Sequence, residues 1–145
     1  TMRFFFYGTL LDGSDNPVAQ AIHALLEPLG PATMRGALHA IPDALGWFPA
    51  LVAGDGLVHG KVYAARPGFS AADLASMDGY EDFDPANPAA SLYLRQELEL
   101  TGGGTAQAYV WNRALPAGAV PIASGDFQEW LASRGMPQFR GAHGG

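Results

Sequence analysis

The sequence contains no cysteine, which excludes disulfide bonds, thiolate nucleophiles and zinc–thiolate sites together. Charged residues are also scarce, at 15% of the chain, and only 8 Lys and Arg stand against 14 Asp and Glu. Phosphate binding relies on clustered cations, so a net charge of −6 without such a cluster argues against nucleic acid as a partner. No apolar run approaches the roughly 20 residues that are needed to cross a bilayer.

What the chain does have is a large share of hydrophobic residues, 48% of 145, which is enough to bury one core. We therefore expect a single domain over residues 1–140, followed by a flexible, glycine-rich tail over residues 141–145. The apolar run at residues 4–6 is too short for a signal peptide, so we expect a cytoplasmic protein that does not bind membranes. The sequence leaves the oligomeric state open.

Hydrophobic periodicity alternates between the repeats of strands and helices, which predicts an α+β fold. Residues 2–7 are almost wholly apolar, which is typical of a strand covered on both faces. Asn16 and Pro17 mark the start of a helix whose apolar positions extend to Leu29. The Gly-Asp-Gly triplet at 54–56 indicates a turn. The other expected elements are strands at 33–41, 48–52, 57–65, 92–100 and 105–111, a helix capped by Ser70 with Asp73, and a late helix containing Phe127, Trp130 and Leu131 and capped by Ser124 or Asp126.

The motifs of the common cofactors are absent from the sequence. The triplet at 54–56 is followed by His59 where a dinucleotide fingerprint needs its third glycine. Asp82 and Asp84 could open a calcium loop, but the later positions of such a loop carry no suitable ligands. The four histidines lack the spacing of metal ligands. We therefore expect neither a cofactor nor a metal.

The first candidate functional segment is Tyr7, Gly8, Thr9 and Leu10, at the end of the opening apolar run. A glycine where a buried strand stops allows a positive φ, which can turn successive backbone N–H groups toward one point. Such a group of amides suits a carboxylate or a developing oxyanion. An ordinary strand exit has the same composition, so the tetrapeptide alone does not decide between the two.

The second candidate is the acidic stretch over residues 78–84, in which aromatic residues interleave with four carboxylates. Apolar neighbours can raise the pKa of one carboxyl toward that of a working base. Asp78 and Glu81 are three residues apart, so on a helix they share a face, and their repulsion acts in the same direction. A solvated helix end is the alternative interpretation.

Together these segments resemble the gamma-glutamylcyclotransferase-like superfamily, in particular its gamma-glutamylamine cyclotransferase branch. The resemblance covers roughly residues 3–111. The matching segments, in the family's order, are Tyr7-Gly8-Thr9-Leu10, Asp15-Asn16 at a helix start, Phe48-Pro49-Ala50-Leu51, Val58-His59-Gly60-Lys61-Val62-Tyr63, Met77-Asp78-Gly79-Tyr80-Glu81, Tyr93-Leu94-Arg95 and Ala108-Tyr109-Val110.

The resemblance implies a small mixed β-barrel-like sheet flanked by a few helices. It also implies release of 5-oxoproline from a small gamma-glutamyl compound without a cofactor. By position, Glu81 matches the family's catalytic acid/base, residues 7–10 match the loop that holds the gamma-glutamyl group, and Tyr109 falls near a tyrosine that lines the site. After the catalytic glutamate the family often has glycine, where this chain has Asp82.

Such a substrate carries its own nucleophile, the α-amino group, and its own electrophile, the γ-amide carbon. A well-oriented ring closure of this kind can be favoured by on the order of 7–11 kcal/mol. The α-amine has a pKa of roughly 7.7–8.0, so a carboxylate of raised pKa at Glu81 could take its proton and later give one to the departing nitrogen. The amides from Gly8 to Leu10 would hold either the substrate carboxylate or the γ-oxyanion.

Two other functions fit the same residues. A non-catalytic member of the fold would keep the pocket as a ligand-binding or interaction module. A hydrolase would use Glu81 to activate water and release free glutamate instead of the cyclic product. The identity of the leaving amine is open in every case.

Overall fold

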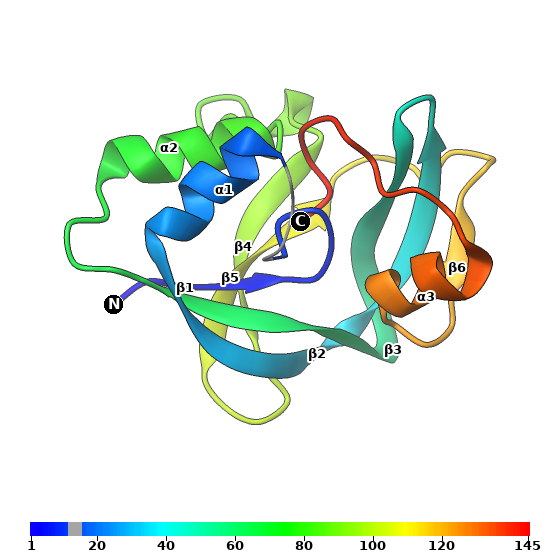
Figure 1. The fold of residues 1–145 in the computed structure, drawn as a ribbon, viewed down its shortest axis with the longest axis horizontal. Coiled ribbons are helices and arrows are strands. Elements are labelled where there is room, and N and C mark those ends of the chain that lie inside the picture. The colour runs from blue at the N-terminus through cyan, green and yellow to red at the C-terminus, as the bar shows by residue number, and fades with distance from the viewer. Residues whose placement is uncertain (12–15) are drawn as a thin grey trace.

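A computed structural model describes residues 1–11 and 16–145 (Figure 1). In this part of the chain, six strands form one sheet in the order β4-β5-β1-β3-β2-β6, accompanied by three α-helices and one 3-10 turn. The elements are β1 (Arg3–Phe6), α1 (Pro17–Ala24), β2 (Leu26–Asp43), β3 (Gly46–Ala65), α2 (Ala71–Tyr80), η1 (Pro88–Ala90), β4 (Tyr93–Glu99), β5 (Thr105–Trp111), β6 (Val120–Ile122) and α3 (Phe127–Arg134). The prediction of an α+β fold with a small mixed β-barrel-like sheet flanked by a few helices is confirmed, with the sheet curled into a half-barrel.

Strand β1 lies in the middle of the sheet, antiparallel to β3 and parallel to β5. The side chains of β1 and of Tyr7, which follows it, alternate between two hydrophobic clusters, with Phe4 and Phe6 in one and Phe5 and Tyr7 in the other. The first cluster includes residues of α1 and α2, and the second includes residues of α3. Burial on both faces explains why residues 4–6 of this strand are all phenylalanine.

Strands β2 and β3 form a long hairpin that curves across the molecule (Figure 1). The sequence predicts a helix as far as Leu29, but α1 ends at Ala24 and Leu26 already pairs with Ala65 of β3. Proline at position 28 lacks the N–H that a helix interior requires, so the chain leaves the helix early.

The prediction of a turn at residues 54–56 is wrong, because these residues lie inside β3. Arg35 pairs with Leu57 and Ala37 pairs with Val52, so Gly36 alone lies opposite residues 53–56. This irregularity is a large bulge in the hairpin. A Cβ at Gly54 would lie 2.8 Å from the Cβ of Ala37, so the bulge requires glycine for close approach.

The predicted helix starts agree with the structure. Asn16 accepts hydrogen bonds from the amides of Val18 and Ala19, and Ser70 and Asp73 form a capping box. Asp126, one of the two caps considered, accepts from the amide of Glu129. Asp15, which the family resemblance places beside Asn16, lies outside the described residues. Within residues 1–11 and 16–145, no helix has the length and apolar character that crossing a bilayer requires.

Candidate active site

Glu81 is the residue that immediately follows α2, and its side chain is completely buried. Helix α2 packs through Met77 and Tyr80, which are both buried in the cluster that contains Phe4 and Phe6. The amide of Glu81 still donates to the carbonyls of Met77 and Asp78. The end of α2 therefore holds the carboxylate inside the molecule, toward the sheet.

The turn after β1 presents three backbone amides to a common occupant. The amides of Tyr7 and Gly8 donate to the carbonyl oxygen of Gly145, over 3.0 and 2.7 Å, and the amide of Thr9 donates to that of Gly144, over 3.0 Å. This convergence agrees with the expectation of an amide cluster, although Tyr7 supplies the third amide. Leu10 is buried in the core, and its carbonyl contacts Nε2 of His23 at 2.5 Å.

Position 8 requires glycine because a side chain would not fit there. The sequence instead predicts that glycine is needed for a positive φ, and that reason is wrong. Gly8 keeps a φ outside the left-handed region. A Cβ there would lie 2.1 Å from the carbonyl oxygen of Gly144 and 2.4 Å from Cγ of Pro49. The bare backbone allows an occupant to approach the amides closely.

The occupant of this site is the segment of residues 141–145, which the sequence predicts to be a flexible tail. The structure differs: Gly144 and Gly145 are buried, and the segment ends beside the turn that follows β1 (Figure 1). The amide of Gly144 donates to Oε2 of Glu81 over 2.9 Å, and the amide of Gly145 donates to Oε1 over 2.7 Å. One dipeptide thus links the carboxylate of Glu81 to the amides after β1.

Burial raises the pKa of Glu81 from its usual 4.5 to about 8. The two amides of the 141–145 segment act against this effect because they stabilise the ionised carboxylate. The negative charge of Asp78 adds a smaller upward contribution, as expected from the shared helix face. The carboxyl can therefore exchange a proton near neutral pH, which a general acid/base requires.

Four tyrosines surround the carboxylate, and burial raises the pKa of each one. These are Tyr7, Tyr80, Tyr93 and Tyr109, and the charge of Glu81 contributes to the rise at all four. The Tyr93 hydroxyl donates to the carbonyl of Pro49 over 2.7 Å, and the Tyr80 hydroxyl donates to Oγ1 of Thr9 over 3.3 Å. With raised pKa values these phenols stay neutral, so they surround the carboxylate without adding charge.

Tyr109 lies next to the site through Asp78. Its hydroxyl donates to Oδ1 of Asp78 over 2.7 Å, and its backbone carbonyl accepts from the Tyr7 hydroxyl over 2.5 Å. Asp78 also pairs with Arg95 at 2.9 Å. Sequence reasoning did not single out Tyr80 or Tyr93 as site residues, although both lie in segments that resemble the family.

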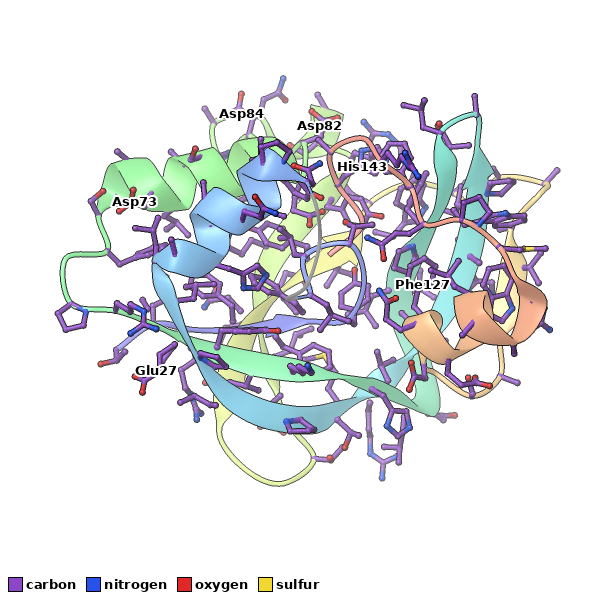
Figure 2. The ribbon with its side chains drawn as sticks, in the orientation of Figure 1. Glu27, Asp73, Asp82, Asp84, Phe127 and His143 are labelled. Atoms are coloured by element: carbon purple, nitrogen blue, oxygen red, sulfur yellow. The ribbon has the colours of Figure 1, made fainter. Side chains whose placement is uncertain are left out.

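Asp82 occupies a backbone conformation that favours glycine, with a φ of +52°. Its amide donates to the carbonyl of Gly79, and its carbonyl accepts from the amide of Leu92. Aspartate tolerates this conformation better than most residues do. The turn that follows Glu81 is therefore one that glycine would also form, which explains how Asp82 can replace the family's common residue. Figure 2 shows Asp82 and His143 near each other at this end of the molecule.

An open groove of about 1240 Å³ runs beside the turn that follows β1. Its lining includes Leu11, Tyr80, Gln128 and Phe139. The side chain of Gln128 donates to the carbonyl of Gly8 over 3.4 Å, which joins the groove wall to the amide cluster. Within the described part of the chain, no three His, Asp or Glu side chains cluster in a way that could hold a metal ion.

Comparison with known proteins assigns the chain to a family. The family model described as "Gamma-glutamyl cyclotransferase, AIG2-like" matches residues 4–129. The chain therefore belongs to this family. No curated protein matches the chain significantly.

Solved structures from three organisms share the fold. An uncharacterized protein from Pyrococcus horikoshii is 19% identical, with a TM-score of 0.65 over 93% of this chain and 97% of that chain. The protein ytfP from Escherichia coli is 27% identical, with a TM-score of 0.58 over 89% of this chain and 98% of that chain. An aig2-like protein from Mus musculus is 21% identical, with a TM-score of 0.51 over 97% of this chain and 86% of that chain.

Proposed function

We propose that this protein is a cofactor-independent gamma-glutamyl cyclotransferase that converts a gamma-glutamyl amine or amino acid into 5-oxoproline and a free amine. Membership of the gamma-glutamyl cyclotransferase, AIG2-like family supports the reaction class. The buried carboxylate of Glu81 opposite a cluster of backbone amides supports the roles of the residues.

The observation that carries the proposal is the way in which the site holds Gly145. Its amide nitrogen donates to Glu81, and its carbonyl oxygen accepts from the amides of Tyr7 and Gly8. The N–Cα–C–O framework of this residue is also that of the α-amino acid end of a gamma-glutamyl group. A substrate in the same position would direct its α-amine to Glu81 and its α-carboxylate to the two amides. This supports the carboxylate, and not the γ-oxyanion, as their ligand.

The proposed reaction needs one group that accepts a proton and returns one. Glu81 takes a proton from the α-ammonium group, and the freed nitrogen attacks the γ-amide carbon to close a five-membered ring. The bond between that carbon and the leaving nitrogen then breaks, and Glu81 delivers its proton to the departing amine. The ring nitrogen still carries one proton more than a lactam holds, and Glu81 takes that proton and passes it to the amine, which leaves as an ammonium ion. Burial raises the pKa of Glu81 toward that of an α-amine, so the transfer of the first proton requires little free energy.

The groove beside Leu11, Tyr80 and Gln128 offers room for the leaving amine. It opens next to the carbonyl of Gly8, so an extended substrate could pass from the amide cluster into the groove. The amine is thus proposed to point toward Phe139 and not toward the core.

The test is the conversion of a panel of gamma-glutamyl amines, with products identified by mass spectrometry. We expect 5-oxoproline, and we expect Glu81→Gln to lower kcat by at least the roughly 10²–10⁴-fold that general acid–base catalysis contributes. Glu99→Gln, at an exposed position of β4, is the matched control and should leave kcat unchanged. Free glutamate as the product would instead indicate a hydrolase, and unaltered turnover by Glu81→Gln would falsify the role of Glu81.

A further inference from the structure

We propose that residues 141–145 form an autoinhibitory segment that occupies the substrate site and must withdraw before a substrate can bind. The inference rests on the proposed function for the identity of the substrate. The occupation of the site by the segment does not depend on that identity.

The segment uses every polar group that the proposed substrate would need. Both carboxylate oxygens of Glu81 accept its amides, and the amides of Tyr7, Gly8 and Thr9 donate to its carbonyls. The hydroxyl of Thr9 also donates to the carbonyl of His143. A gamma-glutamyl group and this segment therefore cannot be bound at the same time.

The segment is also fitted to the site by shape. Gly144 and Gly145 both have a positive φ, at 103° and 60°. A Cβ at Gly144 would lie 2.9 Å from Cγ2 of Thr9, and one at Gly145 would lie 2.5 Å from Cζ of Tyr7. Side chains at these two positions would prevent docking.

An aromatic anchor holds the segment just before the two glycines. The ring of His143 lies against Phe48, Phe139 and Tyr93, with centroids 4.5, 4.7 and 5.9 Å apart. The segment is thus held by ring packing as well as by its backbone hydrogen bonds.

The chain changes its attachment at Arg140, which gives the segment a hinge. Up to this residue it is fixed to the β2–β3 hairpin. The amide of Trp47 donates to the carbonyl of Pro137, the amide of Phe139 donates to the carbonyl of Trp47, and the amide of Arg140 donates to the carbonyl of Leu45. Ala142 is exposed. Residues 141–145 can therefore leave the site without breaking a strand.

An occupant that belongs to the same chain acts as an intramolecular competitor. It reduces the fraction of molecules that can bind substrate and so raises KM, but it does not change the complex once substrate is bound. If the docked form makes up about 90% of the molecules or more, removal of the segment lowers KM roughly tenfold or more.

The experiment compares Gly145→Val with Ala142→Val in the full chain. The first places a side chain against Tyr7, whereas the second adds the same side chain at an exposed position of the same segment. We expect Gly145→Val to lower KM for a gamma-glutamyl amine roughly tenfold or more with kcat unchanged, and Ala142→Val to behave as the wild type. Equal KM values in all three proteins would overturn the inference and leave the proposed function intact.

A binding measurement that needs no turnover separates the two proposals. The probe is a synthetic peptide of residues 137–145 with an amidated end, titrated into each protein by calorimetry. We expect binding to Gly145→Val and not to the wild type, whose site is already occupied. Peptide binding without product from any substrate would support the segment and refute the cyclotransferase. Absence of both would refute both.

Discussion

At the scale of single residues, Glu81 shows how two opposing effects set one proton affinity. Complete burial disfavours the charged form of its carboxyl, while two backbone amides favour it. Burial is the larger effect, so the pKa rises to about 8. The value follows from where the side chain lies and not from an unusual partner.

The raised pKa of Glu81 can be measured by NMR of the glutamate side-chain carboxyl carbons. We expect one resonance, absent in Glu81→Gln, to titrate near pH 8. Asp78→Asn should lower that pKa, because the charge of Asp78 contributes to raising it. Titration of all glutamates below pH 6 would contradict the raised pKa.

The same shift makes the stability of the fold depend on pH. Between pH 4.5 and 8 the folded protein binds more protons at Glu81 than the unfolded chain does, so the free energy of unfolding falls as pH rises, by at most about 1.4 kcal/mol per pH unit.

At Asp82, the conformation of the backbone and not the side chain determines how a substitution changes the stability of the fold. At a φ of +52°, Asp82→Gly should be more stable than Asp82→Ala by about 1 kcal/mol in urea denaturation. Gly79 is the matched control, because it lies exposed inside α2 with open space around it. There the order reverses, and Gly79→Ala should be more stable than the wild type by roughly 0.5–1 kcal/mol. The same order at both positions would contradict the backbone argument.

At the scale of elements, the 141–145 segment links site occupancy to pH through His143. Burial lowers the pKa of this histidine, while the nearby charges of Asp43 and Asp82 raise it by less. The second titrating group next to the segment is the carboxyl of Glu81, at the end of α2. The docked segment therefore favours neutral His143, and protonation favours the released segment.

We accordingly expect the segment to leave the site as pH falls below the ordinary histidine pKa of about 6.5. The ¹⁵N chemical shift of the Gly145 amide would report release. His143→Phe keeps an aromatic ring among Phe48, Phe139 and Tyr93 but cannot be protonated, so its segment should stay docked at the same pH. A common pH midpoint for both proteins would show that His143 does not control docking.

The elements that the sequence predicts well are those with local signals. The caps at Asn16 and Ser70 and the hairpin of β4 and β5 are specified by neighbouring residues. The helix expected to reach Leu29 gives way to β2 because Leu26 pairs with Ala65, far along the chain. The triplet at 54–56 forms a bulge and not a turn, since its conformation depends on Gly36 in the opposite strand.

At the scale of the whole molecule, the two halves of the site come from distant parts of the sequence. The family resemblance identifies Glu81 and the tetrapeptide of residues 7–10. In the structure both form hydrogen bonds to the same dipeptide, Gly144 and Gly145. The role of residues 141–145 could not be read from composition, because a glycine-rich segment has no preferred structure of its own. Its conformation is set by donors and acceptors that only the complete fold assembles.

The central position of β1 has a consequence for synthesis of the chain. Its partners β3 and β5 emerge from the ribosome later, and β5 ends only at Trp111. The β2–β3 hairpin can pair as soon as it appears, whereas the opening strand keeps one unpaired edge until β5 follows. A nascent chain at that stage exposes the edge of a strand that carries three consecutive phenylalanines, which makes it prone to aggregation until β5 pairs.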